Sequence, residues 1–311
     1  MRKQVVRRIF AAFLCVSGFA QIVNIVGEAR LVHLQLPYKA VGLNSTSTGD
    51  LAREWKNAAE SEAVEGRVNS CASARSMPLE VVARERDRRP FHDVPVWRLR
   101  NSRAFFFVSG MTIDADGASN AYSPDDTGLD ELANAGTPAH WDGIATDPDG
   151  NPLIQQEGDP SPGYYVSCTS LSDKTKKFND QTGYVDASKI PYVVLPKEVA
   201  DRGGARLGDF AFVMNLRNGR SSFAIYADIG TLGEGSVALA NALGVRSDAR
   251  TGGQSDGILY VLFTGSGNLR PRTIDEIIGE GERLLAYHAD RIRDLSSCIE
   301  GDDHAVASGR F

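Results

Sequence analysis

Short apolar runs, each closed by turn-forming residues, fill the chain between residues 94 and 270 and limit its fold more than any other feature. The runs are rich in β-branched and aromatic side chains and occupy residues 96–97, 105–108, 164–166, 192–195, 210–214, 222–229 and 259–263. Runs of this length and composition are typical of strands rather than helices. Asn218-Gly219, between two of the runs, is a favoured hairpin dipeptide. We therefore predict a mainly β (α+β) domain over residues 94–270.

Helices are expected at two places. Ser236 precedes an alanine- and leucine-rich run that ends in glycine, and this pattern predicts a short helix. Thr273 and Glu276 form a capping box, and the apolar residues after them keep to one helical stripe. We expect a long C-terminal helix over residues 271–300, packed on the β domain, and a flexible tail over residues 301–311.

The N-terminal part of the chain differs in character. Residues 2–8 are basic and residues 9–26 are mostly apolar, as in an export signal. We predict that residues 1–29 are a signal peptide or a membrane anchor. The protein would then be secreted, with a periplasmic or anchored location as alternatives. Residues 30–93 lack the apolar face of a packed helix, which predicts a linker or pro-segment; a surface helix laid over the main domain is the alternative.

The charge of the chain bears on its partners. The formal net charge is −6, and cleavage of residues 1–20 would change it to −10, because four basic residues and no acid would be lost. An acidic exported protein is a poor partner for nucleic acid or for an anionic membrane surface. We therefore expect no nucleic-acid partner, and no membrane contact other than the possible N-terminal anchor. The protein would attract a polycation.

The cysteines carry no metal or redox motif. Cys15, Cys71, Cys168 and Cys298 include no CxxC pair. With Cys15 in the predicted leader, the other three allow one disulfide and one free thiol, and the pairing stays open.

Carboxylates are the main chemical resource of the sequence. The five histidines are scattered, and neither a GxSxG elbow nor a P-loop is present, so we expect no metal or cofactor. Glycoside hydrolysis needs two acids. Asp228 and Glu234 are the best candidates, because the two glycines between them let the chain fold back. A bent loop can deliver the separation of roughly 6.5–9.5 Å between carboxyl groups that inverting glycosidases use.

Asp228 stands near the end of a predicted strand. Strand alternation places Ala224, Tyr226 and Asp228 on one face, so that Tyr226 would present an aromatic ring beside the acid in a sugar-binding cleft. Apolar neighbours favour a raised pKa for Asp228 and thus the role of proton donor. The alternative is that Asp228 only opens an Asp-Ile-Gly turn.

Glu234 lies just ahead of the helix predicted to begin at Ser236. The helix dipole and the free amides of the first turn favour the charged form of a nearby carboxylate. That suits Glu234 to be the base that activates water. The alternative is an acid of the capping region without chemistry.

Asp114 and Asp116 belong to a separate acidic turn, IDADG. The segment does not match a calcium-binding EF-hand loop, because Ser119 stands where the loop needs glycine and Asp125 where it needs glutamate. We expect the two aspartates to line an acidic cleft that binds cationic groups of the substrate. A structural turn and a metal loop of another kind are the alternatives.

Several of these motifs resemble chitosanases of glycoside hydrolase family 75. YADIGTLGEGS is similar to the segment that carries the essential pair of acids in that family, and MTIDADGASNAY is similar to its acidic DxDG element. YVDASKIPYVVLP and DGILYVLFTGSG resemble family strands, so the likeness covers residues 94–267 in order. Ala227 stands where the fungal members have glycine, the loop to Glu234 is shorter, and the C-terminal helix has no counterpart. The resemblance implies that Asp228 and Glu234 are the catalytic pair.

The order strand, hairpin, strand, loop and short helix also resembles the core of double-psi β-barrels, with short helices and a long C-terminal helix added. Together these features lead to one hypothesis: endo-hydrolysis of β-1,4 links between glucosamine units of chitosan, with inversion. In it Asp228 protonates the leaving oxygen, Glu234 activates water, and Asp114, Asp116 and Tyr226 bind the cationic sugar. The alternatives are an expansin-like wall-glycan binder without catalysis and a peptidoglycan-directed glycoside hydrolase.

Overall fold

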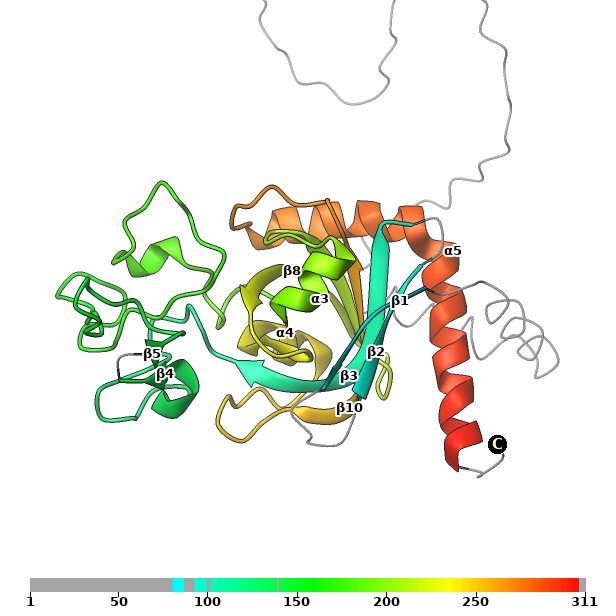
Figure 1. The fold of residues 1–311 in the computed structure, drawn as a ribbon, viewed down its shortest axis with the longest axis horizontal. Helices are drawn as coiled ribbons and strands as arrows, with labels where there is room; N and C mark the ends of the chain where they lie inside the picture. The colour runs from blue at the N-terminus through cyan, green and yellow to red at the C-terminus, as the bar shows by residue number, and fades with distance from the viewer. Residues whose placement is uncertain (1–79, 87–92, 100–101, 139, 308–311) are drawn as a thin grey trace, which may run out of the picture. The chain divides into compact units, whose positions relative to one another are not determined.

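The computed structural model describes residues 80–86, 93–99, 102–138 and 140–307 (Figure 1). The predicted leader and most of the predicted linker lie outside these residues. The strands are β1 (Glu80–Arg86), β2 (Asp93–Arg98), β3 (Ala104–Asp114), β4 (Gly136–Thr137), β5 (His140–Trp141), β6 (Tyr192–Leu195), β7 (Phe210–Asn215), β8 (Ser221–Ile229), β9 (Glu234–Ser236) and β10 (Gln254–Phe263). The helices are α3 (Lys197–Gly203), α4 (Val237–Leu243) and α5 (Ile274–Ala307), with short 3-10 turns η1 (Leu132–Ala135) and η2 (Gln181–Gly183).

Six of these strands close into a β-barrel. Neighbours follow the order β3, β10, β7, β8, β6, β9, and β9 returns to pair with β3. The pairs β6–β8 and β3–β9 are parallel, and the other four are antiparallel. β2 pairs with the first half of β3, and β1 pairs with β2. The predicted β domain is thus confirmed as a barrel within a mixed α/β architecture.

Both faces of the barrel strands are buried, which explains why they are continuous apolar runs. One face packs against α5, where Gly281 lies so close to Phe223 that an added Cβ would fall 2.4 Å from the ring. The opposite face fills the barrel, where Phe107 and Tyr260 stack with ring centroids 4.6 Å apart. The Tyr260 hydroxyl donates to the carbonyl oxygen of Gly110 at 3.0 Å, which satisfies the polar end of this buried ring.

The predicted turn and helix signals are confirmed. Asn218-Gly219 joins β7 to β8, and Gly219 has the positive φ of 73° that this turn requires. Ser236 caps α4, and the Thr273 amide donates to the Glu276 carboxylate at 2.9 Å as in a capping box. No helix in the described part of the chain is long and apolar enough to cross a bilayer.

Two predicted boundaries are wrong. α5 continues to Ala307, so most of the predicted flexible tail (301–311) is helical. A single glycine, Gly301, costs only about 1 kcal/mol inside a helix and does not end it. In addition, β1 falls within the predicted linker (30–93), because its backbone gains the ladder of hydrogen bonds that β2 offers.

Residues 115–191 form a loop-rich lobe that connects β3 to β6, drawn in green beside the barrel in Figure 1. The predicted strand at 164–166 makes only isolated bridges here. Side-chain hydrogen bonds of the buried Gln181 take the place of strand pairing in this lobe. Its amide group donates to the carbonyl oxygens of Gly117 and Ser167, and its side-chain carbonyl oxygen accepts from the Ser167 amide. These bonds satisfy backbone groups that a loop would otherwise leave unpaired.

The lobe also carries the one cysteine whose side chain the structure describes. Cys168 is a free thiol, and its burial raises its pKa to about 12. The disulfide pairing left open in the sequence analysis also involves Cys71 and Cys298, whose side chains lie outside those that the structure describes.

The cap of α4 generates a stability prediction. The fully buried Ser236 hydroxyl accepts from the amides of Leu239 and Tyr192 and donates to the carbonyl oxygen of Ile190. Ser236→Ala leaves these three groups without their partner, so the free energy of unfolding should fall by about 2–3 kcal/mol. Denaturant titration measures this, with the exposed Ser255→Ala as control; equal midpoints for the two variants would contradict it.

Candidate active site

β6 lies between β8 and β9, and this arrangement positions the two candidate acids. Val194 on β6 is the register partner of Asp228 on β8 and also of Glu234 on β9. Adjacent strands lie about 4.8 Å apart, so the two acids stand roughly 10 Å apart at their Cα atoms, one on each side of Val194. The sheet therefore brings together the pair that the sequence predicted.

The loop between the two acids is short, and its two glycines have different roles. Gly233 adopts a φ of 83°, which turns the chain back into β9. Gly230 leaves space for the catalytic candidate, because an added Cβ would fall 2.7 Å from Oε2 of Glu234. The same Oε2 accepts a hydrogen bond from the Thr231 amide at 2.8 Å. The loop thus holds the Glu234 side chain as well as its backbone.

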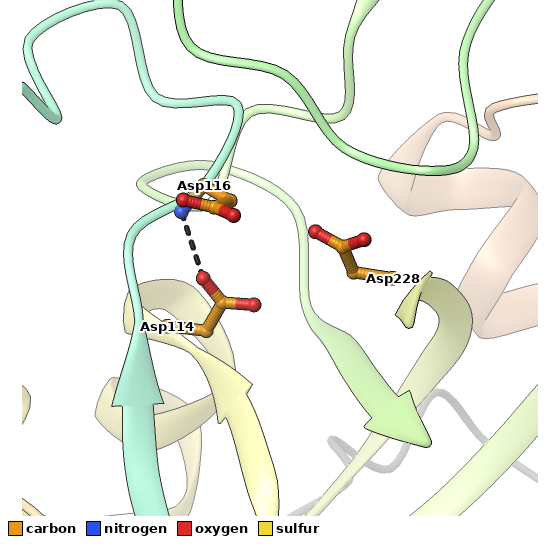
Figure 2. Close-up of side chains that lie close together, drawn as sticks. All are labelled: Asp114, Asp116 and Asp228. Carbon is orange, nitrogen blue, oxygen red and sulfur yellow. Dashed lines mark hydrogen bonds between the residues drawn. The ribbon is translucent and has the colours of Figure 1, made fainter. Parts of the chain in front are cut away.

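β3 brings a second acidic group to the same place. Asp114 ends this strand, and Asp116 follows in the turn, where its amide donates to Oδ1 of Asp114 at 2.9 Å. Figure 2 shows both carboxylates directed toward Asp228. Carboxylate oxygens of the three residues lie within 4.8 Å of one another. The parallel pairing of β3 with β9 sets Thr112 opposite Glu234 and Asp114 opposite Ser236, so the end of β3 lies along the strand that carries Glu234.

These residues line one cavity of about 410 Å³. Six of the residues around it are acidic and none is basic: Asp114, Asp116, Asp130, Asp142, Asp228 and Glu234. A cavity with this lining favours a ligand with positive charge.

Asp228 is almost completely buried, with 7% of its surface exposed. Burial raises its pKa to about 6, although three hydrogen bonds to Oδ1 oppose that rise. The donors are the Ser170 hydroxyl at 2.5 Å, the Ser170 amide at 3.0 Å and the Ile229 amide at 2.8 Å. Asp228 can therefore exchange a proton near neutral pH, as a general acid must.

The pKa values of Asp114 and Asp116 are also raised well above the usual range for aspartate. Burial is the main cause for both, and the nearby charge of Asp228 adds to it. A hydrogen bond of 2.6 Å from the Tyr122 hydroxyl to Oδ1 of Asp116 offsets part of the rise. These two carboxyl groups would ionise more readily beside a bound cation. They are, with Asp228, the residues that could hold an ammonium group or a metal ion.

The prediction for Tyr226 is wrong. Only 2% of its surface is exposed, and its ring packs inside the barrel rather than lining the cavity. Alternation along β8 is as predicted, but neither face of this strand is open to solvent. Asp228 reaches the cavity because it lies at the end of β8, where the barrel gives way to the lobe.

Several cavity residues were not predicted from the sequence. Ser170, Asp130, Asn134 and Asp142 come from the lobe, and Tyr122 follows the IDADG turn. No motif marks the first four, because their segments have neither strand nor helix periodicity. Tyr122 could have been suspected, since it stands six residues after Asp116 in the segment that resembled a family element.

A family comparison agrees with this geometry. Residues 142–286 match the family described as fungal chitosanase of glycosyl hydrolase group 75. This segment is similar to group 75 glycoside hydrolases. It holds Asp228, Glu234 and Ser170, whereas β3 with Asp114 and Asp116 precedes the matched residues. A comparison with curated proteins finds no match.

The raised pKa of Asp228 generates a prediction for the stability of the fold. A buried carboxyl group with a pKa raised from 3.8 to about 6 destabilises the fold as pH rises through that window, because the ionised form is poorly solvated. Asp228→Asn keeps an acceptor for Ser170 and Ile229 without the charge. The variant should therefore gain on the order of 2 kcal/mol in unfolding free energy relative to the parent at pH 8, and little at pH 4.

Thermal and denaturant unfolding at several pH values measures this difference. Asp149→Asn, on an exposed turn, is the control and should follow the parent at every pH. A stability difference for Asp228→Asn that is the same at pH 4 and pH 8 would refute the prediction.

Proposed function

We propose that the acidic cavity is the active site of an endo-acting chitosanase that hydrolyses β-1,4 links between glucosamine units with inversion. The observation that carries this proposal is the lining of the cavity, in which four further carboxyl groups accompany the candidate pair without any basic residue. Chitosan carries an ammonium group on each deacetylated unit, so it matches this lining. The family description, fungal chitosanase, supports the same substrate.

Asp228 is the proposed proton donor. Its pKa of about 6 leaves a large protonated fraction in mildly acidic solution. Its three hydrogen bonds all end on Oδ1, which leaves Oδ2 to carry the proton toward the glycosidic oxygen. Glu234 is the proposed base, and its Oε2 is held by the Thr231 amide. In the reaction, Asp228 protonates the leaving oxygen while Glu234 takes a proton from the attacking water.

The spacing across β6 supports inversion. Retaining enzymes need their two carboxyl groups about 5 Å apart, whereas inverting enzymes need roughly 6.5–9.5 Å to admit a water molecule. Two strand spacings separate the backbones of Asp228 and Glu234, with Val194 between them. This separation leaves room for a water molecule beside the sugar.

Asp114 and Asp116 are the proposed partners of a substrate ammonium group. Burial raises their pKa values, and a cation placed beside them would favour their ionised forms and lower those pKa values. Substrate binding would then release protons. No cofactor enters this mechanism.

The remaining parts of the proposal concern fold detail and location. The two parallel pairs, β6–β8 and β3–β9, support a double-psi connectivity for the barrel. The basic and apolar N-terminal segment supports secretion, with a periplasmic or anchored form as the variant. A polymer too large to enter a cell is a substrate that a secreted enzyme can reach.

Removal of either acid should abolish hydrolysis. Asp228→Asn and Glu234→Gln should each lower kcat/KM on chitosan by at least about 100-fold, because each removes one proton-transfer step. Release of new reducing ends from chitosan and from purified murein, measured side by side, gives the rate and the substrate class. Proton NMR of the first products should show the α-anomer, as expected for inversion of a β-link.

Glu198→Gln, at an exposed ion pair on α3, is the matched control and should keep the parent rate. Near-normal activity in either active-site variant would overturn the site assignment. Chitosan binding by the parent without new reducing ends would instead indicate a non-catalytic binder.

Ser170 offers a test of which acid is the donor. Its hydroxyl lowers the pKa of Asp228, so Ser170→Ala should raise that pKa above about 6. If Asp228 donates the proton, the alkaline limb of the kcat/KM profile moves to higher pH in the variant. A shift of the acidic limb would show instead that Asp228 acts as the base. Ser255→Ala serves as the control with an unchanged profile.

A further inference from the structure

A second cavity, of about 420 Å³, adjoins the acidic one. The two share Asp142 and Ser170 among their lining residues, so a polymer that lies in the first cavity can continue into the second. Its volume falls within the range of about 300–1,000 Å³ that is usual for small-ligand sites. The lobe builds this second cavity, which we call the lysine pocket.

The lysine pocket differs from the acidic cavity in charge. Three exposed lysines line it, Lys174, Lys176 and Lys177, against the two aspartates Asp142 and Asp173. Among the described residues none of the three lysines forms an ion pair with a carboxylate. The ammonium groups of Lys174 and Lys176 donate to neutral oxygens, of Ser172 at 2.8 Å and of Thr182 at 3.1 Å. No direct ion pair therefore neutralises these ammonium groups, while Lys176 also interacts electrostatically with Asp173 and Asp180.

Aromatic rings complete the lysine pocket. Trp141 and Tyr184 are half-buried in its wall, and Phe178 is 60% exposed at the same pocket. The Tyr184 hydroxyl donates to the Phe178 carbonyl oxygen at 2.6 Å, which fixes these two residues relative to each other. Aromatic walls with a few polar groups are typical of sites that bind sugar-sized ligands.

These features select against a charged glucosamine unit and for an acetylated one. A glucosamine ammonium group in the lysine pocket would meet three lysines against two aspartates, so like charges outnumber opposite charges there. Acetylation removes that charge. It also supplies a carbonyl oxygen that can accept from a lysine and a methyl group that can pack on an aromatic ring.

We propose that the lysine pocket binds an N-acetylglucosamine unit of the same chain that is cleaved in the acidic cavity. This inference rests on the proposed function. The enzyme then recognises a deacetylated unit and an acetylated unit at a fixed distance from each other. Its preferred substrate is partially acetylated chitosan rather than the fully deacetylated polymer.

Product sequencing tests the inference. The parent enzyme digests a randomly and partially acetylated chitosan, and mass spectrometry of end-labelled products gives the acetylation at each position from the new ends. We expect one position to be enriched in acetylated units. In the variant with Lys174→Gln, Lys176→Gln and Lys177→Gln together, this enrichment should fall to the random level. The preference for partially acetylated over fully deacetylated chitosan, as a ratio of kcat/KM values, should fall by about tenfold.

Two further variants keep the result interpretable. Lys174→Gln with Lys177→Gln leaves Lys176 and its bond to Thr182 in place, and should lose most of the enrichment without loss of thermal stability. Lys197→Gln, on α3, removes a positive charge outside both cavities and should leave enrichment and preference unchanged.

The outcomes separate the two proposals. Random acetylation at all positions in the parent products, or enrichment that survives in the triple variant, overturns the lysine pocket assignment and leaves chitosan hydrolysis standing. Failure of the parent to cleave either polymer overturns the proposed function and this inference with it.

Discussion

The pairing of β6 with β8 on one side and β9 on the other is the constraint on which the site depends. β6 is only four residues long and fully buried, and its register with β8 shifts between Val193 and Val194, which brings Val194 opposite Asp228. Through Val194 that register places Asp228 and Glu234 at the same level of the sheet. One parallel and one antiparallel neighbour are needed for this, because the acid at the end of β8 and the acid at the start of β9 must meet at one edge. The hydrogen bonds that close the barrel at β6 therefore also position Asp228 and Glu234 on either side of Val194.

The acidic cavity concentrates charge where water is scarce, and this has a cost. Burial raises the pKa values of Asp114, Asp116 and Asp228; the charge of Asp228 adds to the rise at Asp114 and Asp116, and the charge of Glu234 adds to the rise at Asp228. Hydrogen bonds from Ser170 and Tyr122 offset only part of this. A substrate that carries its own positive charges relieves the rest, so binding and ionisation favour each other. The same carboxyl groups that destabilise the empty site favour a positively charged ligand.

Features that depend on local sequence could be predicted, and those that depend on distant contacts could not. The barrel strands, the caps of α4 and α5, and the pairing of Asp228 with Glu234 follow from patterns within a few residues. Ser170 is 58 positions from Asp228 and lies in a segment without periodicity, so only the folded lobe reveals its role. Tyr226 was misplaced for another reason: alternation identifies a face of a strand, but not whether that face is open to solvent.

The lobe unites the acid chemistry with the choice of substrate. Ser170 reaches Asp228 only when the lobe is seated on the end of β8, so the proton affinity of the donor depends on that contact. The same segment continues into the lysines and aromatic rings of the lysine pocket. The two adjoining cavities differ in charge: one is lined by six acids and no base, and the other by three lysines and two aspartates. This difference is the physical ground for the proposal that acetylated and deacetylated units of one polymer bind in different cavities.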